Sequence, residues 1–292
     1  MFGLKKFASV MAVVCLMAVS SVAMAATDIS DGIIRAEGIS GLGQSFAVQR
    51  IAARVIAERN LAEQIHGVQI DGNTTVENAI VTSDVINAKV SGLIKGAREV
   101  SVAQDEYGYV HVIMEMPIYG ASNSLAAVTM PQIPQQEFLP PSDIIPVDKI
   151  TEDSTTITDI EGESGAKPSI NTNQATMSNL YGATGQYTGL IVDCSGMGLQ
   201  TAMAPAIVTE GRKIVYGLEK FSREQVLNRG YVGYSKSATE GVGRAGSNPM
   251  VIKAEGIERF CNPVISKEDA AKILAENQMN GFLSAGNVVF VK

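Results

Sequence analysis

The stretch Ile33-Ile34-Arg35-Ala36-Glu37-Gly38-Ile39 and the segment that follows it, residues 45–65, decide the fold of the first half of the chain. The first stretch reads as a β-strand. The second has the period of an amphipathic helix, and its apolar residues are predicted to form the core face: Ala47, Val48, Ile51, Val55, Ala62 and Ile65. Arg54 and Glu58 lie on that face, one turn apart. We interpret them as an ion pair at the edge of the core, with a recognition pair as the alternative.

Two further features complete a domain over residues 27–120. Ser83 is a typical N-cap for a second helix, which Gly96 ends. A hairpin follows, in which residues 99–104 alternate and the second strand points its apolar side chains to one face: Val110, Val112, Met114 and Met116. The order of strand, helices and hairpin predicts an α+β fold, with an antiparallel sheet whose helices pack on one face.

Residues 186–292 predict a second small domain. It starts with a strand at residues 187–193 and continues with a hairpin that turns at Glu210-Gly211. Ser222 and Ser266 are expected to cap two helices, and residues 250–257 and 287–291 predict two more strands. These elements predict an α/β or α+β domain whose strand order stays open.

The sequence between the two domains, residues 121–185, differs in composition from both. It holds six of the ten prolines, among Ser, Thr, Asn, Gln and acidic residues. Such a stretch cannot bury enough apolar surface to offset the entropy lost on ordering. We therefore predict a Pro-rich disordered linker that joins the two small domains.

The N-terminus has the pattern of a secretory signal peptide over residues 1–25. Lys5 and Lys6 precede a short apolar run, and Ala23-Met24-Ala25 forms an A-x-A site with cleavage expected between Ala25 and Ala26. Cys15 allows a lipoprotein signal as an alternative, but it follows Val14 and the apolar run continues beyond it. We expect a periplasmic protein that is released after cleavage.

Composition narrows the classes of partner. Removing Lys5 and Lys6 with the signal peptide takes the formal charge from −7 to −9, and the pI is about 5.0. Nucleic acids and anionic lipid surfaces are bound through clustered Lys and Arg, so we expect no nucleic-acid partner. Trp is absent and aromatic residues make up 5% of the chain, which disfavours a sugar-stacking platform.

No arrangement of residues predicts catalysis, a cofactor or a metal. The glycine-rich stretch after the strand at 187–193 lacks the third glycine and the helix start of a dinucleotide loop. Its Ser195, Gly196 and Gly198 therefore predict a tight turn, or at most a loop that contacts a small ligand. A nucleophile there would need a general base, and residues 186–292 contain no histidine. His111 and Glu115 share one strand face without a third metal ligand.

Two cysteines follow the signal peptide, Cys194 and Cys261. An even pair in an oxidising compartment allows a disulfide, and two separate buried thiols are the alternative. Sequence does not show whether the two Cα atoms come close enough to be bridged.

Three segments of the first domain carry a family resemblance: Ile33-Ile34-Arg35-Ala36-Glu37-Gly38, the A-x-R-x-x-A-x-x-N-L pattern of residues 52–61, and Gly92-Leu93-Ile94-Lys95-Gly96-Ala97. Over about residues 27–118 the chain resembles the small envelope lipoprotein family related to the N-terminal domain of flagellar assembly protein T. The resemblance implies an outer-membrane or periplasmic protein, which in some members is tied to the flagellar basal body. The C-terminal half resembles uncharacterised envelope proteins that start with a similar Tyr187-Thr188-Gly189-Leu190-Ile191-Val192-Asp193.

These observations favour a non-enzymatic structural or assembly protein of the periplasm or outer membrane, with envelope or flagellar basal-body proteins as partners. The alternative is a soluble module that binds a small ligand or cell-wall glycan, with Tyr216, Tyr231 and Tyr234 near a cleft. The sequence leaves the oligomeric state open.

Overall fold

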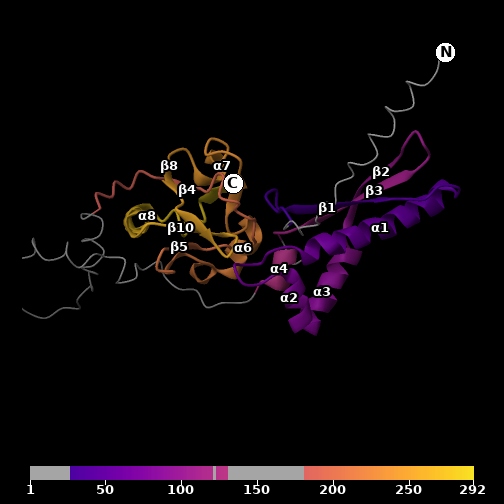
Figure 1. Cartoon of the computed structure of the whole chain (residues 1–292), viewed down its shortest axis with the longest axis horizontal. Helices are drawn as coiled ribbons and strands as arrows, with labels where there is room; N and C mark the ends of the chain where they lie inside the picture. The colour runs from indigo at the N-terminus through magenta and orange to yellow at the C-terminus, as the bar shows by residue number, and fades with distance from the viewer. Residues whose placement is uncertain (1–26, 121–122, 131–180) are drawn as a thin grey trace, which may run out of the picture.

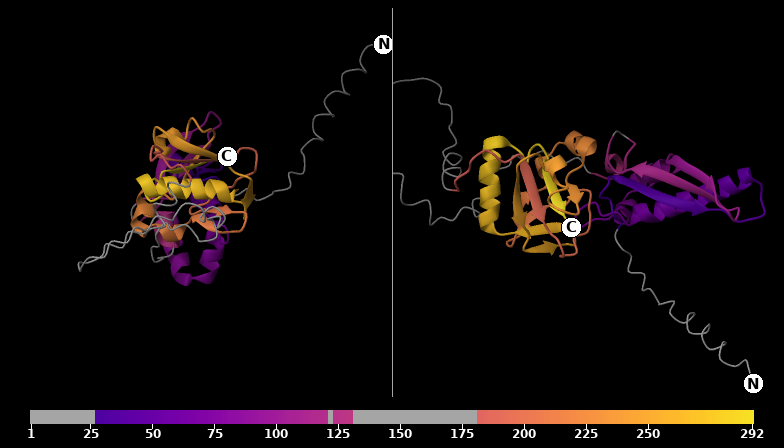
Figure 2. Two further views of the ribbon diagram at one scale, coloured as in Figure 1. Left: turned by 90° about the vertical axis from the view of Figure 1, so that its left-hand side faces the viewer. Right: turned by 90° about the horizontal axis from the view of Figure 1, so that it is seen from above.

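A computed structural model describes residues 27–120, 123–130 and 181–292 of the chain (Figure 1). The predicted signal peptide, with its cleavage site at Ala25 and Ala26, lies outside the described residues, as do residues 131–180 of the predicted linker. The described residues form two α+β halves that lie end to end (Figure 2). Within these residues no helix has both the length and the apolar character needed to cross a membrane.

The first half is a three-stranded antiparallel sheet covered on one face by a long helix, as predicted. The strands are β1 (Ile33–Ile39), β2 (Arg98–Gln104) and β3 (Val110–Pro117), in the order β1-β3-β2. Helix α1 (Phe46–His66) packs across β1 and β3. The predicted inward face of β3 is confirmed, because all four of its apolar residues are buried: Val110, Val112, Met114 and Met116.

Glycine and alanine set the distance between α1 and the sheet. A Cβ atom on Gly38 would lie 2.0 Å from the carbonyl oxygen of Ala53 and 2.3 Å from the amide nitrogen of Ala57, so β1 touches the helix backbone. Asn60 of α1 donates a hydrogen bond of 2.8 Å to the carbonyl of Glu37. At this contact α1 presents Ala53 and Ala57 to the sheet, since only small side chains fit between two backbones this close.

The predicted core face of α1 is wrong for most of its residues. Of the six, only Ile65 is buried, and Val48, Ile51 and Val55 keep 47%, 64% and 60% of their surface exposed. The buried stripe is instead Gln49, Ala53, Ala57, Leu61 and Ile65. The helix carries apolar residues on more than one face, so periodicity alone could not choose between them. The close contact at Gly38 selects the stripe with the alanines.

Three shorter helices lie beside the C-terminal part of α1. Helices α2 (Val76–Thr82) and α3 (Asp84–Lys95) form a hairpin, in which Ser83 caps α3 and Gly96 ends it as predicted. Helix α4 (Leu125–Thr129) falls inside the stretch predicted to be a disordered linker. Ser124 caps α4 and its Leu125 and Ala126 are fully buried, so packed structure continues to Met130 and the predicted start of the linker is corrected.

The second half contains two four-stranded sheets, and they settle the strand order that the sequence left open. The order of the first is β7-β11-β4-β8, and all its neighbouring strands are parallel: β4 (Gly189–Asp193), β7 (Gly233–Ser235), β8 (Pro249–Lys253) and β11 (Val288–Val291). The second is mixed, in the order β6-β5-β10-β9: β5 (Ile207–Thr209), β6 (Ile214–Tyr216), β9 (Gly256–Glu258) and β10 (Asn262–Ile265). The single strand predicted at residues 250–257 is thus two strands, β8 and β9, in different sheets.

The helices of this half are α6 (Arg223–Arg229), α7 (Val242–Ala245), α8 (Lys267–Asn280) and the short 3-10 helix η2 (Leu218–Lys220). Ser222 and Gln225 form the predicted capping box of α6. Ser266 caps α8, and Gly281 ends it in the left-handed conformation.

The two halves also contact each other directly. The backbone amides of Met203 and Ala204 donate hydrogen bonds of 2.9 and 2.7 Å to the carbonyls of Gln69 and Ile70. The hydroxyl of Tyr119 donates to the carbonyl of Met203 at 2.9 Å. Buried apolar residues of both halves belong to one continuous cluster. Among the described residues the halves therefore share a packed junction as well as a covalent connection.

Candidate binding site at the junction of the two halves

The loop of Ser195, Gly196 and Gly198 follows β4 at the carboxyl end of the parallel sheet. Asp193 Oδ1 accepts a hydrogen bond of 2.9 Å from the Ser195 amide, and bonds from Ser195 hold the pKa of Asp193 below its ordinary value. Both glycines have positive φ, 76° and 72°, as a tight turn requires. The loop lines none of the four cavities described for the structure. Its role as a ligand loop stays a prediction.

Of the two alternatives for the cysteines, the structure has separate thiols, since Cys194 and Cys261 are both free and buried. Each thiol has its own acceptor: Cys194 Sγ lies 3.8 Å from the carbonyl of Val192, and Cys261 Sγ lies 3.4 Å from Oδ1 of Asn262. Burial raises the pKa of each thiol to about 12. One cysteine follows β4 and the other precedes β10 of the second sheet, and the alternative of two separate buried thiols describes them.

Two of the three tyrosines expected near a ligand cleft, Tyr216 and Tyr231, lie in the core. Tyr216 and Tyr231 pack with ring centroids 4.6 Å apart, and the hydroxyl of Tyr216 donates to the carbonyl of Tyr231 at 2.8 Å. The hydroxyl of Tyr234 donates to the carbonyl of Ala202 at 2.9 Å. Burial raises the pKa of all three hydroxyls. Tyr234 is half-buried and lines a cavity of about 330 Å³, so the expectation of tyrosines near a cleft is wrong for Tyr216 and Tyr231.

His111 and Glu115, which share one face of β3, form ion pairs on the outer face of the sheet. Glu115 binds Arg35 and Arg98, at 3.0 and 2.8 Å. His111 contacts Glu37 at 2.7 Å and Asp105 at 3.4 Å, and these hydrogen bonds raise its pKa above the ordinary value. Within the described ranges, no three His, Cys, Asp or Glu side chains are grouped so that they could hold a metal ion.

Arg54 and Glu58 form the predicted ion pair, at 3.0 Å. Because α1 presents a different stripe to the sheet, this pair lies on the solvent side of the helix next to the exposed Val55.

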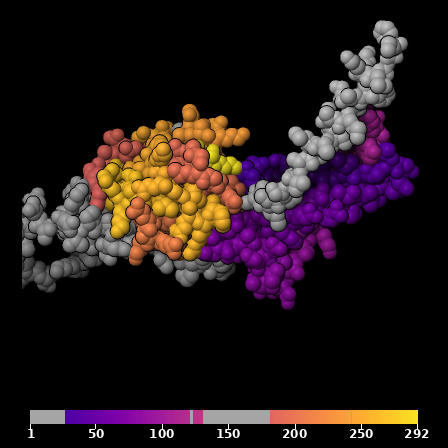
Figure 3. Space-filling view, viewed as in Figure 1, coloured from indigo at the N-terminus to yellow at the C-terminus, as the bar shows by residue number. Residues whose placement is uncertain are grey.

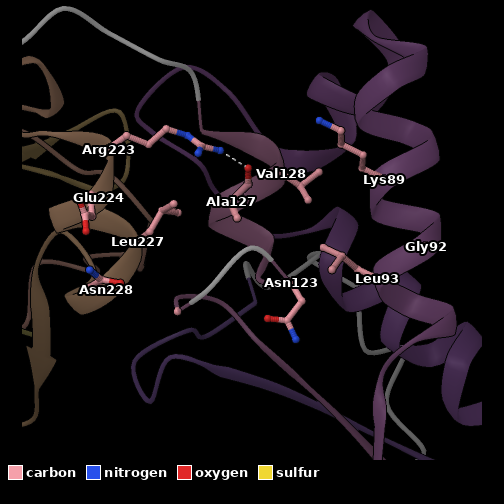
Figure 4. A pocket seen from close by; sticks show the side chains of 11 residues that line it. Lys89, Gly92, Leu93, Asn123, Ala127, Val128, Arg223, Glu224, Leu227 and Asn228 are labelled. Atoms are coloured by element: carbon pink, nitrogen blue, oxygen red, sulfur yellow. Dashed lines mark hydrogen bonds between the residues drawn. The ribbon is translucent and has the colours of Figure 1, made fainter.

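A cavity of about 810 Å³ lies where α3, α4 and α6 meet, between the two halves (Figure 4). Its apolar lining comes from Leu93 of α3, Ala127 and Val128 of α4, and Leu227 of α6. Lys89, Asn123, Arg223, Glu224 and Asn228 supply the polar groups. This volume falls in the range of known small-molecule sites, and the arrangement suits a ligand with an apolar body and one polar end.

Sequence reasoning missed this cavity because its walls come from both halves and from the presumed linker. The available signal was local: Ser124 before the apolar run Leu125-Ala126-Ala127-Val128 is a typical helix start.

Comparison with known proteins bears on the second half of the chain. Residues 189–292 match the family model of the second domain of Treponema pallidum Tp0624. The match begins at the first residue of β4 and covers both C-terminal sheets, so this half is similar to the second domain of Tp0624. It covers less than half of the chain and does not include residues 27–118, on which the lipoprotein-family resemblance rests. No curated protein matches the chain.

Proposed function

We propose that the chain is a non-enzymatic assembly protein of the bacterial cell envelope, which binds another envelope protein through the outer face of α1. The observation that carries the proposal is the exposed apolar stripe of this helix. Val48, Ile51 and Val55 follow one another at spacings of three and four residues, and each is about half exposed or more. Phe46, at the start of the helix, is 49% exposed.

The position of the stripe on the molecule supports its role as a binding surface for another protein. It occupies the N-terminal turns of α1, which project away from the second half, while α2 and α3 lie under the C-terminal part of the helix (Figures 1 and 3). Contiguous exposed apolar residues on a folded protein commonly mark interaction sites. Residues spaced i, i+3 and i+7 on a helix form a seam that a partner's helix or groove can cover. We therefore infer a partner with an apolar helix face or groove.

The predicted export signal and the family resemblance of the first half indicate in which compartment the partner is expected. The signal-peptide pattern of residues 1–25 favours a partner in the periplasm or at the outer membrane. The resemblance to the lipoprotein family related to flagellar assembly protein T adds flagellar basal-body proteins to the candidates.

Photo-crosslinking in cells tests the proposal. A photoreactive amino acid replaces Ile51 in one variant and Val81 in a matched control, since Val81 is an exposed apolar residue of α2 outside the stripe, at 80% exposure. We expect a discrete crosslinked envelope protein from position 51 and none from position 81. The same partner should be lost from wild-type pull-downs when Ile51→Glu and Val55→Glu are introduced. Identical crosslinks from both positions, or none from position 51, would refute the proposal.

A further inference from the structure

The cavity at the junction has a mainly apolar surface whose side chains come from three helices. Leu93, Val128 and Leu227 face it from α3, α4 and α6 (Figure 4). All three are partly buried against the common core, so the cavity opens beside packed structure. Most of its accessible surface is apolar although five polar side chains line it, which limits the number of hydrogen bonds that a ligand can make there.

Two cations stand on opposite walls of this cavity. Lys89 belongs to α3 and Arg223 to α6, and Figure 4 shows them on either side of α4. Among the described residues neither is paired with a carboxylate. Arg223 donates to the carbonyl of Ala127, and its Nε is buried without an acceptor. Glu224, the acidic residue of the lining, lies on the α6 side and well apart from Lys89 in the same view. The lining thus carries an excess positive charge on a chain whose formal charge is −7.

We propose that this cavity binds a long-chain carboxylate, a fatty acid, with its acyl chain against Leu93, Val128 and Leu227 and its carboxylate beside Lys89 on the α3 side. The acyl chain needs no hydrogen-bond partners and matches the apolar lining. The carboxylate supplies the negatively charged partner that Lys89 lacks among the described residues. An acidic peptide fits less well, because its backbone amides and carbonyls would lose water without finding enough polar partners in the cavity. The site is separate from the α1 stripe, so the two proposals can fail independently.

Displacement of a fluorescent fatty acid measures this binding. The protein, residues 26–292, is titrated with 11-(dansylamino)undecanoic acid, and the probe is then displaced by carboxylates of increasing chain length. Burying one more methylene strengthens binding by about fourfold, so the dissociation constant is expected to fall by about that factor per carbon until the cavity is full. The alcohol of the same chain length should bind at least about tenfold more weakly, because it lacks the charge.

Variants assign the binding to this cavity. Lys89→Gln, on an exposed position of α3, should weaken the carboxylate about tenfold and leave the alcohol unchanged. Lys95→Gln, at the exposed end of the same helix and outside the cavity, is the matched control and should change neither. Leu227→Ser should weaken both ligands, with circular dichroism to verify folding. Absence of probe binding, equal effects of the two lysine variants, or stronger displacement by an acidic amphipathic peptide than by the fatty acid would overturn the proposal.

Discussion

Replacing Gly38 with alanine tests how the first half is held together. The added Cβ would lie 2.0 Å from the carbonyl oxygen of Ala53, whereas real Cβ atoms keep at least 3.0 Å from such neighbours. The helix and the strand must then separate by about 1 Å, and a gap of this size forfeits a quarter to a half of each van der Waals contact across it. Because Ala57 and Leu61 share the same contact surface, we expect the free energy of unfolding to fall by about 3 kcal/mol or more.

Urea denaturation followed by circular dichroism measures the effect. Gly41→Ala is the matched control, since a Cβ at Gly41 would meet nothing within 4 Å, and it should change stability by less than about 0.5 kcal/mol. The atoms that meet the new Cβ of Gly38→Ala belong to the helix backbone, so adding Ala57→Gly should not restore stability. Equal, small losses for the two glycine variants would refute the close-contact explanation of the fold.

Three further outcomes are expected. Hydrogen bonds to Glu37 and Asp105 raise the pKa of His111 above 6.5, so its stabilisation is complete below about pH 6.5 and is lost as the pH rises through the folded-state pKa. The urea midpoint of the wild type should therefore fall over that interval, and that of His111→Gln should not. Without reductant, the native thiols Cys194 and Cys261 should resist iodoacetamide at about pH 8, and both should be alkylated in urea; a mass without two adducts would contradict the free thiols. Tyr119→Phe leaves the carbonyl of Met203 without this donor and should cost about 1–2 kcal/mol by urea denaturation; an unchanged midpoint would argue against a stabilising junction.

Local signals predicted most elements of the fold. The alternation of β3, the N-cap Ser83 and the capping box of Ser222 each depend on a few neighbouring residues, and each is confirmed. The single strand predicted at residues 250–257 failed because β8 and β9 pair with strands that come from different parts of the chain. Pairing across such distances leaves no mark in the local pattern.

The candidate sites could not be predicted in the same way. The cavity needs α4, whose five residues lie next to a proline-rich stretch and take their burial from both halves. By composition alone residues 121–185 form one proline-rich segment, and for this reason α4 was not predicted. Tyr216 and Tyr231 illustrate the opposite error: they looked available for a ligand because sequence shows no neighbours, and both are buried.

The two apolar stripes of α1 explain why its outer face is free to bind. Large aliphatic residues are usually drawn into the core, since they bury the most apolar surface. Here Gly38 brings the strand so close to the middle of the helix that only alanine-sized groups fit there, and Ala53 and Ala57 occupy that face. The larger Ile51 and Val55 are thereby left on the solvent side without any loss of close packing at the sheet. Changing Ile51 and Val55 to glutamate should accordingly remove partner binding and leave folding intact. Loss of folding instead would mean that these residues stabilise the protein rather than bind a partner.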